Sequence, residues 1–403
     1  MMKKEVRIYE LFAGIGSQFY ALKKIAKNFQ PISLGACEFY IDAIISYMII
    51  HYGELTPETD FTKEEMHNLL KDFTFSSDSK NQVSKNYFLK IREDKLRKIF
   101  PYLYSFINMD YFNFKYKNSG ERERENFTDI KQITKLPRNI DILKYSFPCQ
   151  DLSQQGKQRG ISPETRSGLL LEVERILKQN KDNLPKVLLL ENVKALITKK
   201  FINDFEKWID VLNELGYKSY YKVINSSDYG SAQNRERVFC VSFLGKHKKF
   251  EFPAKKETKN NNKLTRILKL SEIEEKTILE LDQKIKFSKT KNGIFKAFIP
   301  NYTSFNSENY VYLPKGIGPT LTASGANSRL KFYYQNHKKV RYIDEIQSYQ
   351  YMGFDKKVAK KVKETNLIPK NKMIFTCGNS ISVEVLENLF LSILSSINIQ
   401  KES

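Results

Sequence analysis

The sequence contains few cysteine and histidine residues. Its four cysteines are spread over 403 residues and form no CxxC pair. This spacing excludes a disulfide scaffold and a cysteine zinc ribbon, because both need cysteines in close, regular groups. The four histidines form no HExxH or similar ligand spacing, so we expect no metal site.

Long hydrophobic runs are also missing. The most apolar window, residues 40–52, is too short to span a bilayer and contains Asp42. The N-terminus has two lysines followed by a charged, strand-like run, whereas a signal peptide needs an uninterrupted apolar stretch. We therefore expect a soluble intracellular protein without membrane contact.

The chain has fewer acidic than basic residues. The chain has 67 Lys and Arg against 46 Asp and Glu, a net charge of +21. A basic surface attracts phosphate through counterion release and so favours a polyanionic partner. A lysine-rich genome would explain the same excess, and charge alone does not separate the two. Hydrophobic residues make up 41% of the chain, which excludes global disorder, and the length predicts two or three domains.

Apolar, strand-like runs alternate with helical patterns through the first 245 residues. We expect strands over residues 6–12, 31–38, 140–147, 187–191 and 238–243, and helices over 17–27, 167–178, 201–215 and from 41 onward. This alternation predicts the α/β class, with a mostly parallel, doubly wound sheet of Rossmann type.

Two segments interrupt that alternation. Residues 53–126 are polar and predict a surface insertion, which ends in a charge run over 120–126 that we expect to be solvated. Residues 246–340 have short alternating runs and predict a smaller, irregular β-containing domain. The chain ends in a periodic apolar pattern that predicts a helix over 383–397.

The first predicted strand leads into a glycine turn that contains Phe12, Gly14 and Gly16. Glycines at such a turn let a ligand approach the backbone, and the following helix N-terminus favours negative charge. Glu38 ends the next strand, where a carboxylate can bind ribose hydroxyls. The dinucleotide fingerprint fails because its third glycine falls at Phe19, so the pattern favours a nucleoside without pyrophosphate, such as S-adenosylmethionine. A tight turn without a ligand remains the alternative.

The strongest local pattern is SFPCQ at residues 146–150, directly after a predicted strand. Pro148 fixes the chain direction, so that Cys149 is presented to a cleft. Lys157 and Arg159 in the following loop would supply the positive surroundings that a reactive thiolate needs. The other cysteines lie in apolar runs and predict small core residues; they are Cys37, Cys240 and Cys377.

Two further patterns carry charged side chains near strand ends. Glu191, in Glu-Asn-Val, ends a strand and would act as an acid toward a ring nitrogen. Arg235 and Arg237, in QNRER, precede the strand predicted at 238–243. We expect one arginine to face the active cleft and the other to brace a loop or a phosphate, although each charge by itself is also typical of a surface.

Five motifs occur in a characteristic order. They are FAGIG (12–16), PCQ (148–150), ENV (191–193), QNRER (233–237) and GNS (378–380). Together they resemble the DNA cytosine-5 methyltransferase family over essentially the whole chain. Stretches such as residues 146–156, 305–312 and 318–329 are similar to the CpG-methylating enzymes of wall-less bacteria. The resemblance implies methyl transfer from S-adenosylmethionine to carbon 5 of cytosine in double-stranded DNA at CpG, through a covalent adduct on a flipped-out base.

The resemblance also assigns roles to particular residues. The implied catalytic residues are Cys149, Glu191, Arg235 and Arg237. The implied cofactor ligands are Phe12, Gly14, Ile15, Gly16, Glu38, Phe39, Asp129, Pro148, Leu169, Asn379 and Ser380. The implied DNA contacts are Lys80, Gln150, Ser153, Gln154, Gln233, Thr320, Thr322, Ser324, Gly325, Ala326 and Asn327. From its spacing alone, Asp129 is nearly as well explained as a helix cap.

The implied organisation is a catalytic domain of residues 1–245 and 372–403 and a target-recognition domain of residues 246–371. One region departs from the family pattern, because Asp344, Glu345 and Gln347 stand where a Thr-Pro pair and a glutamate are usual. Stability or sequence preference can differ there. We expect a monomeric, cytoplasmic, nucleoid-associated bacterial enzyme, from which a possible cognate restriction enzyme would act separately.

Two alternatives remain open. A tRNA cytosine methyltransferase can share these motifs, but the full recognition segment argues against it. A catalytically silent DNA-binding protein is disfavoured because the cysteine, glutamate and arginines are intact. An adenine amino-methyltransferase would need an Asp/Asn-Pro-Pro-aromatic motif, which the sequence does not contain.

Overall fold

The computed structural model describes residues 3–116, 124–148, 168–256, 263–269, 279–280, 285–300, 302–304, 306–323 and 328–397. The chain divides into two compact units. The first comprises residues 1–223, 237–253 and 389–403, and the second comprises residues 224–236 and 254–388.

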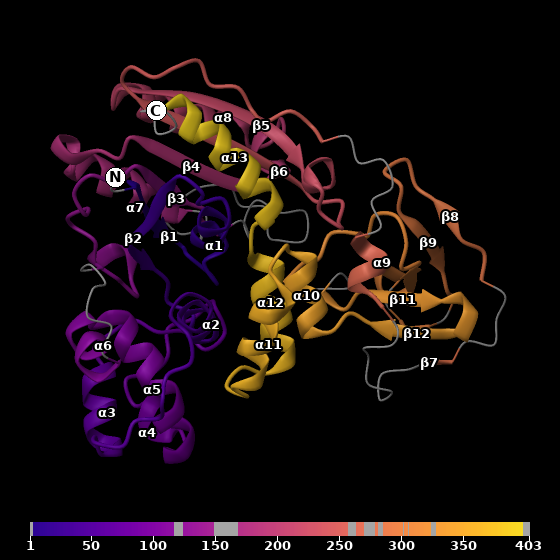
Figure 1. Ribbon diagram of the computed structural model, residues 1–403, viewed down its shortest axis with the longest axis horizontal. Coiled ribbons are helices and arrows are strands. Elements are labelled where there is room, and N and C mark those ends of the chain that lie inside the picture. The colour runs from indigo at the N-terminus through magenta and orange to yellow at the C-terminus, as the bar shows by residue number, and fades with distance from the viewer. Residues whose placement is uncertain are drawn as a thin grey trace. The chain divides into compact units, whose positions relative to one another are not determined.

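The first unit is built on a six-stranded sheet with the order β2-β1-β3-β4-β6-β5 (Figure 1). Its strands are β1 (Lys4–Leu11), β2 (Phe29–Cys37), β3 (Ile142–Tyr145), β4 (Val187–Val193), β5 (Tyr217–Asn225) and β6 (Glu236–Leu244). The neighbours among β1 to β4 pair in parallel, and β6 runs antiparallel to β4. The predicted α/β class with a mostly parallel sheet is confirmed. Strand β5 was not predicted, because most of its side chains are polar or partly exposed.

Helices cover both faces of this sheet. They are α1 (Ser17–Lys24), α2 (Ile41–Tyr52), α7 (Leu169–Gln179), α8 (Ile202–Glu214) and the C-terminal part of α13 (Val383–Ser396). Apolar side chains of α7 and α8 share one core with Tyr9 and Leu11 of β1. Because side chains alternate along a strand, Glu10 faces the other side, where it meets Phe19 of α1 and Tyr47 of α2.

The predicted polar insertion is a small helical module with its own core. Its helices are α3 (Lys63–Leu70), α4 (Tyr87–Lys90), α5 (Glu93–Ile107) and α6 (Met109–Tyr116). They gather at one end of the first unit (Figure 1), and α5 buries Leu96, Phe100 and Leu103 at helical spacing. The expectation of a solvated charge run is wrong for Arg124, which is 7% exposed and stacks 3.7 Å from the centre of the Tyr52 ring.

The second unit contains another six-stranded sheet, with the order β7-β12-β11-β10-β9-β8. Its strands are β7 (Leu279–Glu280), β8 (Ser288–Lys289), β9 (Phe295–Phe298), β10 (Tyr310–Tyr312), β11 (Lys331–Tyr334) and β12 (Lys339–Tyr342). Its helices are α9 (Lys263–Ile267), α10 (Glu345–Tyr351), α11 (Lys356–Glu364), α12 (Lys370–Asn379) and the start of α13. The second, smaller β-containing region is therefore present as predicted.

The compact units follow other limits than the predicted domains in three places: residues 224–236 and 372–388 belong to the second unit, and residues 246–253 belong to the first. Hydrogen bonds between distant residues explain the first difference. The side-chain amide of Gln233 donates to the Tyr351 carbonyl and accepts from the Leu321 backbone N–H. No helix in the described ranges is long and apolar enough to cross a membrane.

Candidate active site

The turn after β1 forms an open backbone cradle. Phe12, Gly14 and Gly16 have φ values of 55°, 59° and 72°, in the left-handed region that favours glycine. A Cβ on Gly16 would clash with the His51 ring of α2, so only glycine fits there. A Cβ on Gly14 would meet no atom within 4 Å. The cradle is therefore packed on its inner side and open to a ligand at Gly14.

The Glu38 carboxylate lies against this turn. Its Oε2 accepts from the Gly14 backbone N–H at 2.8 Å, and its Oε1 accepts from the N–H groups of Phe39 and Tyr40 at 3.0 and 2.9 Å. Desolvation raises the pKa of Glu38, while the three N–H donors act in the opposite direction. The carboxylate is thus held beside the glycine turn, where a ribose ligand is expected.

A buried pair of opposite charges lies beneath the turn. Glu10 of β1 and Lys144 of β3 are partners in the parallel register and are 0% and 2% exposed. The Lys144 ammonium donates to the Phe12 carbonyl at 2.8 Å. Burial raises the pKa of Glu10 to about 7 and lowers that of Lys144 to about 8, and each charge partly offsets the shift of the other. We did not single out either residue from the sequence, although a lysine within the apolar strand at 142–145 was a usable signal.

The Glu10 carboxylate is also hydrogen-bonded on the helical side. It accepts from the Phe19 backbone N–H at 3.3 Å and from the Tyr47 hydroxyl at 3.2 Å. These bonds connect both helices that flank the glycine turn to the strand beneath it. The pair therefore fixes the turn from below.

Asp129 occupies the helix-cap position that its spacing allowed. Its Oδ1 accepts from the Lys131 N–H at 3.0 Å, at the start of the short 3-10 helix η1 (Ile130–Gln132), and its Oδ2 accepts from the Thr74 hydroxyl at 3.3 Å. Other predicted cofactor ligands of the first unit are buried or partly buried; they are Phe12, Ile15, Phe39, Pro148 and Leu169. Asn379 and Ser380 end α12 and belong to the second unit.

Glu191 and Arg237 meet in the first unit. The antiparallel register of β4 and β6 brings them close, and Arg237 Nε lies 3.3 Å from Glu191 Oε1, with Glu191 only 8% exposed. The adjacent Asn192 donates to the Phe147 carbonyl at 3.3 Å. The end of β4 is thereby tied to the chain two residues before Cys149. Cys149 itself lies outside the described residues, as do Gln150, Ser153 and Gln154.

Arg235 has a different environment from Arg237. It precedes β6, is 4% exposed and donates to three backbone carbonyls of the second unit. The distances are 2.8 Å to Leu321, 3.1 Å to Gly378 and 2.9 Å to Ser380. These hydrogen bonds brace the backbone of the second unit, and a role of Arg235 in catalysis stays a prediction.

The predicted DNA contacts lie in different environments. Gln233 is fully buried with its amide groups bonded inside the second unit, so the expectation that it faces DNA does not agree with its position. The Thr320 hydroxyl donates to the Asn234 carbonyl at 2.5 Å. Thr322 is partly buried and Lys80 is exposed. The remaining predicted contacts lie outside the described residues; they are Ser324, Gly325, Ala326 and Asn327.

The glycine of the GNS motif has a packing role that we missed from the sequence. A Cβ on Gly378 would clash with the backbone of Thr322 and Ala323. The predicted recognition segment therefore lies directly on α12, and any larger residue at position 378 would displace it. This contact joins segments 56 residues apart, which no local pattern reveals.

The region that departs from the family pattern forms a helix cap and two ion pairs. Asp344 caps α10 in a capping box with Gln347, through bonds of 2.7 and 3.1 Å. Glu345 pairs with Lys363 at 2.8 Å and with Lys370 at 3.8 Å. These residues begin α10 and connect it to the two following helices, so a local structural reason exists for the departure.

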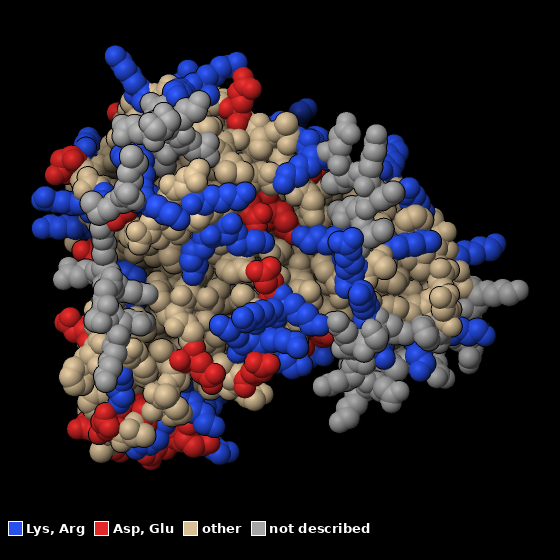
Figure 2. All heavy atoms as spheres, viewed as in Figure 1, with Lys and Arg blue, Asp and Glu red and all other residues tan. Residues whose placement is uncertain are grey.

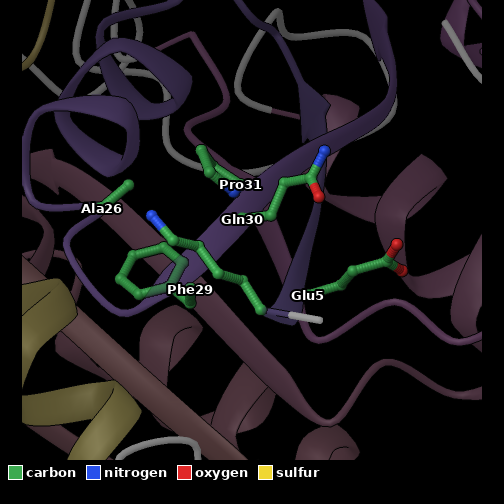
Figure 3. Close-up of a pocket in the computed structure, with 6 residues that line it drawn as sticks. Glu5, Ala26, Phe29, Gln30 and Pro31 are labelled. Atoms are coloured by element: carbon green, nitrogen blue, oxygen red, sulfur yellow. The ribbon is translucent and has the colours of Figure 1, made fainter. Parts of the chain in front are cut away.

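A surface hollow of about 520 Å³ lies at the amino ends of β1 and β2 (Figure 3). It is lined by Lys3, Glu5, Ala26, Phe29, Gln30 and Pro31. Ligands of doubly wound sheets bind at the carboxyl ends of the strands, where the glycine turn lies. The hollow is therefore separate from the candidate active site. Among the described residues, no group of three or more His, Cys, Asp or Glu side chains is arranged to hold a metal.

The sheet, its glycine turn and the carboxylate that faces it form a doubly wound α/β domain with a turn open to a nucleoside ligand. The fold is similar to that of the Dnmt2 methyltransferase of S. pombe, with a TM-score of 0.56 at 16% identity, over 96% of this chain and 98% of that chain. Residues 107–395 match the model of the family described as "C-5 cytosine-specific DNA methylase".

Two relatives resemble nearly the whole chain. The orphan methyltransferase M.SssI of Spiroplasma monobiae is 42% identical over 95% of this chain and 96% of its own length. The type II methyltransferase M2.ScrFI of Lactococcus lactis subsp. cremoris is 31% identical over 97% of this chain and 99% of its own length. The chain therefore belongs to the C-5 cytosine-specific DNA methylase family. It is a DNA cytosine-5 methyltransferase that uses S-adenosylmethionine as methyl donor, and the resemblance stated from its motifs is confirmed.

Proposed function

We propose that this enzyme methylates cytosine at CG sites, on a base flipped out of the DNA helix. The observation that carries the proposed chemistry is the Glu191–Arg237 pair, at an Nε–Oε1 distance of 3.3 Å. Asn192 ties this pair to the segment before Cys149. The carboxylate and the guanidinium, together with Cys149 two positions after Phe147 in the sequence, supply the groups that methylation of carbon 5 needs.

Carbon 5 of cytosine is a poor nucleophile, and covalent catalysis overcomes this difficulty. We assign to Cys149 the attack on ring carbon 6, which forms a carbon–sulfur bond and raises the electron density at carbon 5. Glu191 holds ring nitrogen 3 and the amino group, and Arg237 contacts the carbonyl oxygen of the base. Bound S-adenosylmethionine supplies the methyl group. A water molecule removes the carbon-5 proton, and the carbon–sulfur bond then breaks to release Cys149.

The cofactor site is proposed from the glycine turn and Glu38. The open side of Gly14 admits a ligand, and the Glu38 carboxylate is held next to it for the ribose hydroxyls. Lys144 is a positioning residue, because it holds the Phe12 carbonyl and so the shape of the turn. Further contacts are proposed for Ile15, Gly16, Phe39, Asp129, Pro148, Leu169, Asn379 and Ser380.

DNA recognition is proposed for residues 320–327, with Ser153 and Gln154 filling the space left by the flipped cytosine. The CG preference is supported by the similarity of residues 305–312 and 318–329 to CpG-methylating enzymes. The 42% identity to M.SssI covers 95% of the chain and so includes both stretches. Since one chain carries every motif, we propose a monomer that works in the cytoplasm at the nucleoid. Any cognate restriction enzyme would be a separate protein.

The test is bisulfite sequencing of unmethylated plasmid after incubation with the protein and S-adenosylmethionine. We expect methylation at every CG with the wild-type protein and none with Cys149→Ser, because a serine hydroxyl is too weak a nucleophile to form the adduct. Cys377→Ala is the matched control, since Cys377 is buried in α12, and it should retain activity.

Each other outcome changes a different part of the proposal. Methylation confined to a longer motif would contradict the CG preference and leave the chemistry intact. Activity of Cys149→Ser would contradict the assignment of the nucleophile. Methylation of tRNA without methylation of the plasmid would favour the RNA alternative. DNA binding with no methylation of either would favour the silent binder.

A further inference from the structure

Helix α11 of the second unit presents a lysine face to solvent. Its apolar side chains Ala359 and Val362 are buried, whereas Lys357, Lys360 and Lys361 are exposed. The exposed lysines are three and four residues apart, so they lie on one side of the helix. Figure 2 shows Lys and Arg side chains gathered over the place that α11 occupies in Figure 1.

Two neighbouring lysines have an acidic partner. Lys363 pairs with Glu345 at 2.8 Å, and Lys370 approaches the same carboxylate at 3.8 Å. Within the described part of the chain, Lys357, Lys360 and Lys361 form no ion pair with an acidic side chain. Three like charges on adjacent turns repel each other, so an anionic ligand would relieve that repulsion.

A uniform excess of lysine does not explain this face. Residues 53–116, which hold the helical module of the first unit, contain ten Lys or Arg and ten Asp or Glu. Residues 355–372 contain seven lysines against only Asp355 and Glu364. The net positive charge of the chain is therefore concentrated in particular segments, and α11 is one of them.

We propose that Lys357, Lys360 and Lys361 bind the phosphate backbone of duplex DNA and add affinity that does not depend on base sequence. The four residue steps from Lys357 to Lys361 span about 6 Å of helix axis at a rise of about 1.5 Å per residue. A DNA strand carries a phosphate about every 3.4 Å along its axis, so the three ammonium groups can face neighbouring phosphates. The proposal rests on DNA as the substrate and is independent of the CG preference.

The test measures affinity for a duplex without CG sites as a function of salt. The triple variant Lys357→Gln, Lys360→Gln, Lys361→Gln is compared with a control that removes three exposed lysines of the helical module, Lys90→Gln, Lys95→Gln, Lys98→Gln. Each lost phosphate contact reduces the magnitude of the slope of log K against log salt by about 0.9. The magnitude of the slope should therefore fall by up to about 2.7 in the α11 variant. The control should keep the wild-type slope.

Two further measurements separate this role from folding and catalysis. The triple Lys→Arg variant keeps the charge and should restore the slope, and thermal unfolding should show that all variants fold. On CG-containing DNA, the Lys→Gln variant should raise KM for DNA and leave kcat unchanged. If the triple variant unfolds, Lys360→Gln alone should lower the slope by about 0.9.

Three results would overturn the proposal. The first is a wild-type slope in the folded α11 variant. The second is an equal reduction of the slope in the α11 variant and in the control, which would show that only the total charge of the protein matters. The third is a loss of affinity for a structured RNA together with unchanged affinity for duplex DNA.

Discussion

The carboxyl edge of the first unit's sheet and helix α11 of the second unit carry their charges in different ways. At the carboxyl edge of its sheet, the first unit pairs charged groups that are buried or partly buried, as in Glu191–Arg237 and Glu10–Lys144. In the second unit, α11 exposes three lysines to solvent, and none of them forms an ion pair within the described residues. Buried pairs act through fixed geometry, and removing one partner leaves an uncompensated charge. Exposed lysines act over a distance and are screened by salt, so each contributes little.

The largest expected effect tests Glu191, to which we assign contacts with the cytosine ring. Glu191→Gln keeps the size of the side chain but removes its charge, so kcat should fall by about 10³-fold. Methylation rates on CG-containing DNA at saturating substrates measure this loss. Glu206→Gln, at an exposed position of α8, is the matched control and should be neutral. A kcat near the wild-type value in Glu191→Gln would remove Glu191 from the catalytic group.

The second prediction concerns the pair beneath the cofactor turn. Lys144→Met leaves the Glu10 carboxylate buried without an opposite charge, which should lower the free energy of unfolding by about 3 kcal/mol at neutral to slightly basic pH. The variant should also raise KM for S-adenosylmethionine, because the Phe12 carbonyl loses its donor. Urea unfolding and cofactor titration measure the two effects. In the double variant Glu10→Gln, Lys144→Met, part of the lost stability should return.

The same variant has a defined pH dependence. The pKa of Glu10 is raised in the folded protein to about 7, so its contribution to stability is present below the unfolded pKa and is lost as pH rises through 7. Without Lys144, the ionised Glu10 carboxylate destabilises the folded protein further. The difference in free energy of unfolding between wild type and Lys144→Met should therefore be small near pH 5 and grow toward pH 8. A difference independent of pH would show that the two charges are not coupled.

The third prediction compares two glycines that meet different surroundings. Gly378→Ala forces the backbone at Thr322 and Ala323 to move and should cost about 2 kcal/mol of stability. Gly14→Ala meets no atom but must hold a left-handed φ of 59°, which costs about 1 kcal/mol. Gly14→Ala should mainly raise KM for S-adenosylmethionine, and Gly378→Ala should mainly lower the melting temperature. The reverse assignment would contradict the two roles.

The smallest expected effect tests the exposed side of the comparison. Lys360→Gln alone should weaken DNA binding by no more than about 1 kcal/mol at physiological salt. Near 1 M salt, where the screening length is about 3 Å, that effect should vanish. The stability loss in Lys144→Met should persist at both salt concentrations, because buried charges are screened much less. Equal salt sensitivity of the two variants would contradict the contrast between the buried charges of the first unit and the exposed lysines of α11.

Much of the first unit could be predicted from local patterns. Strands β1, β2 and β6 and helices α1, α2 and α8 lie within a few residues of their predicted limits, because each has a regular apolar pattern. The helices of the insertion were not predicted. Their apolar spacing is mixed with many charged residues, and their core forms only when α5 packs against its neighbours.

What the sequence determined by itself is the family and the chemistry. Its five motifs appear in the characteristic order along the chain, and the family model matches residues 107–395. Only the tertiary structure showed that Arg237 pairs with Glu191 and that Arg235 donates to backbone carbonyls of the second unit. It also buried Gln233, placed Gly378 against Thr322 and paired Glu10 with Lys144. The physical reason is that these contacts join residues far apart in the chain, and local periodicity carries no information about which of them will meet.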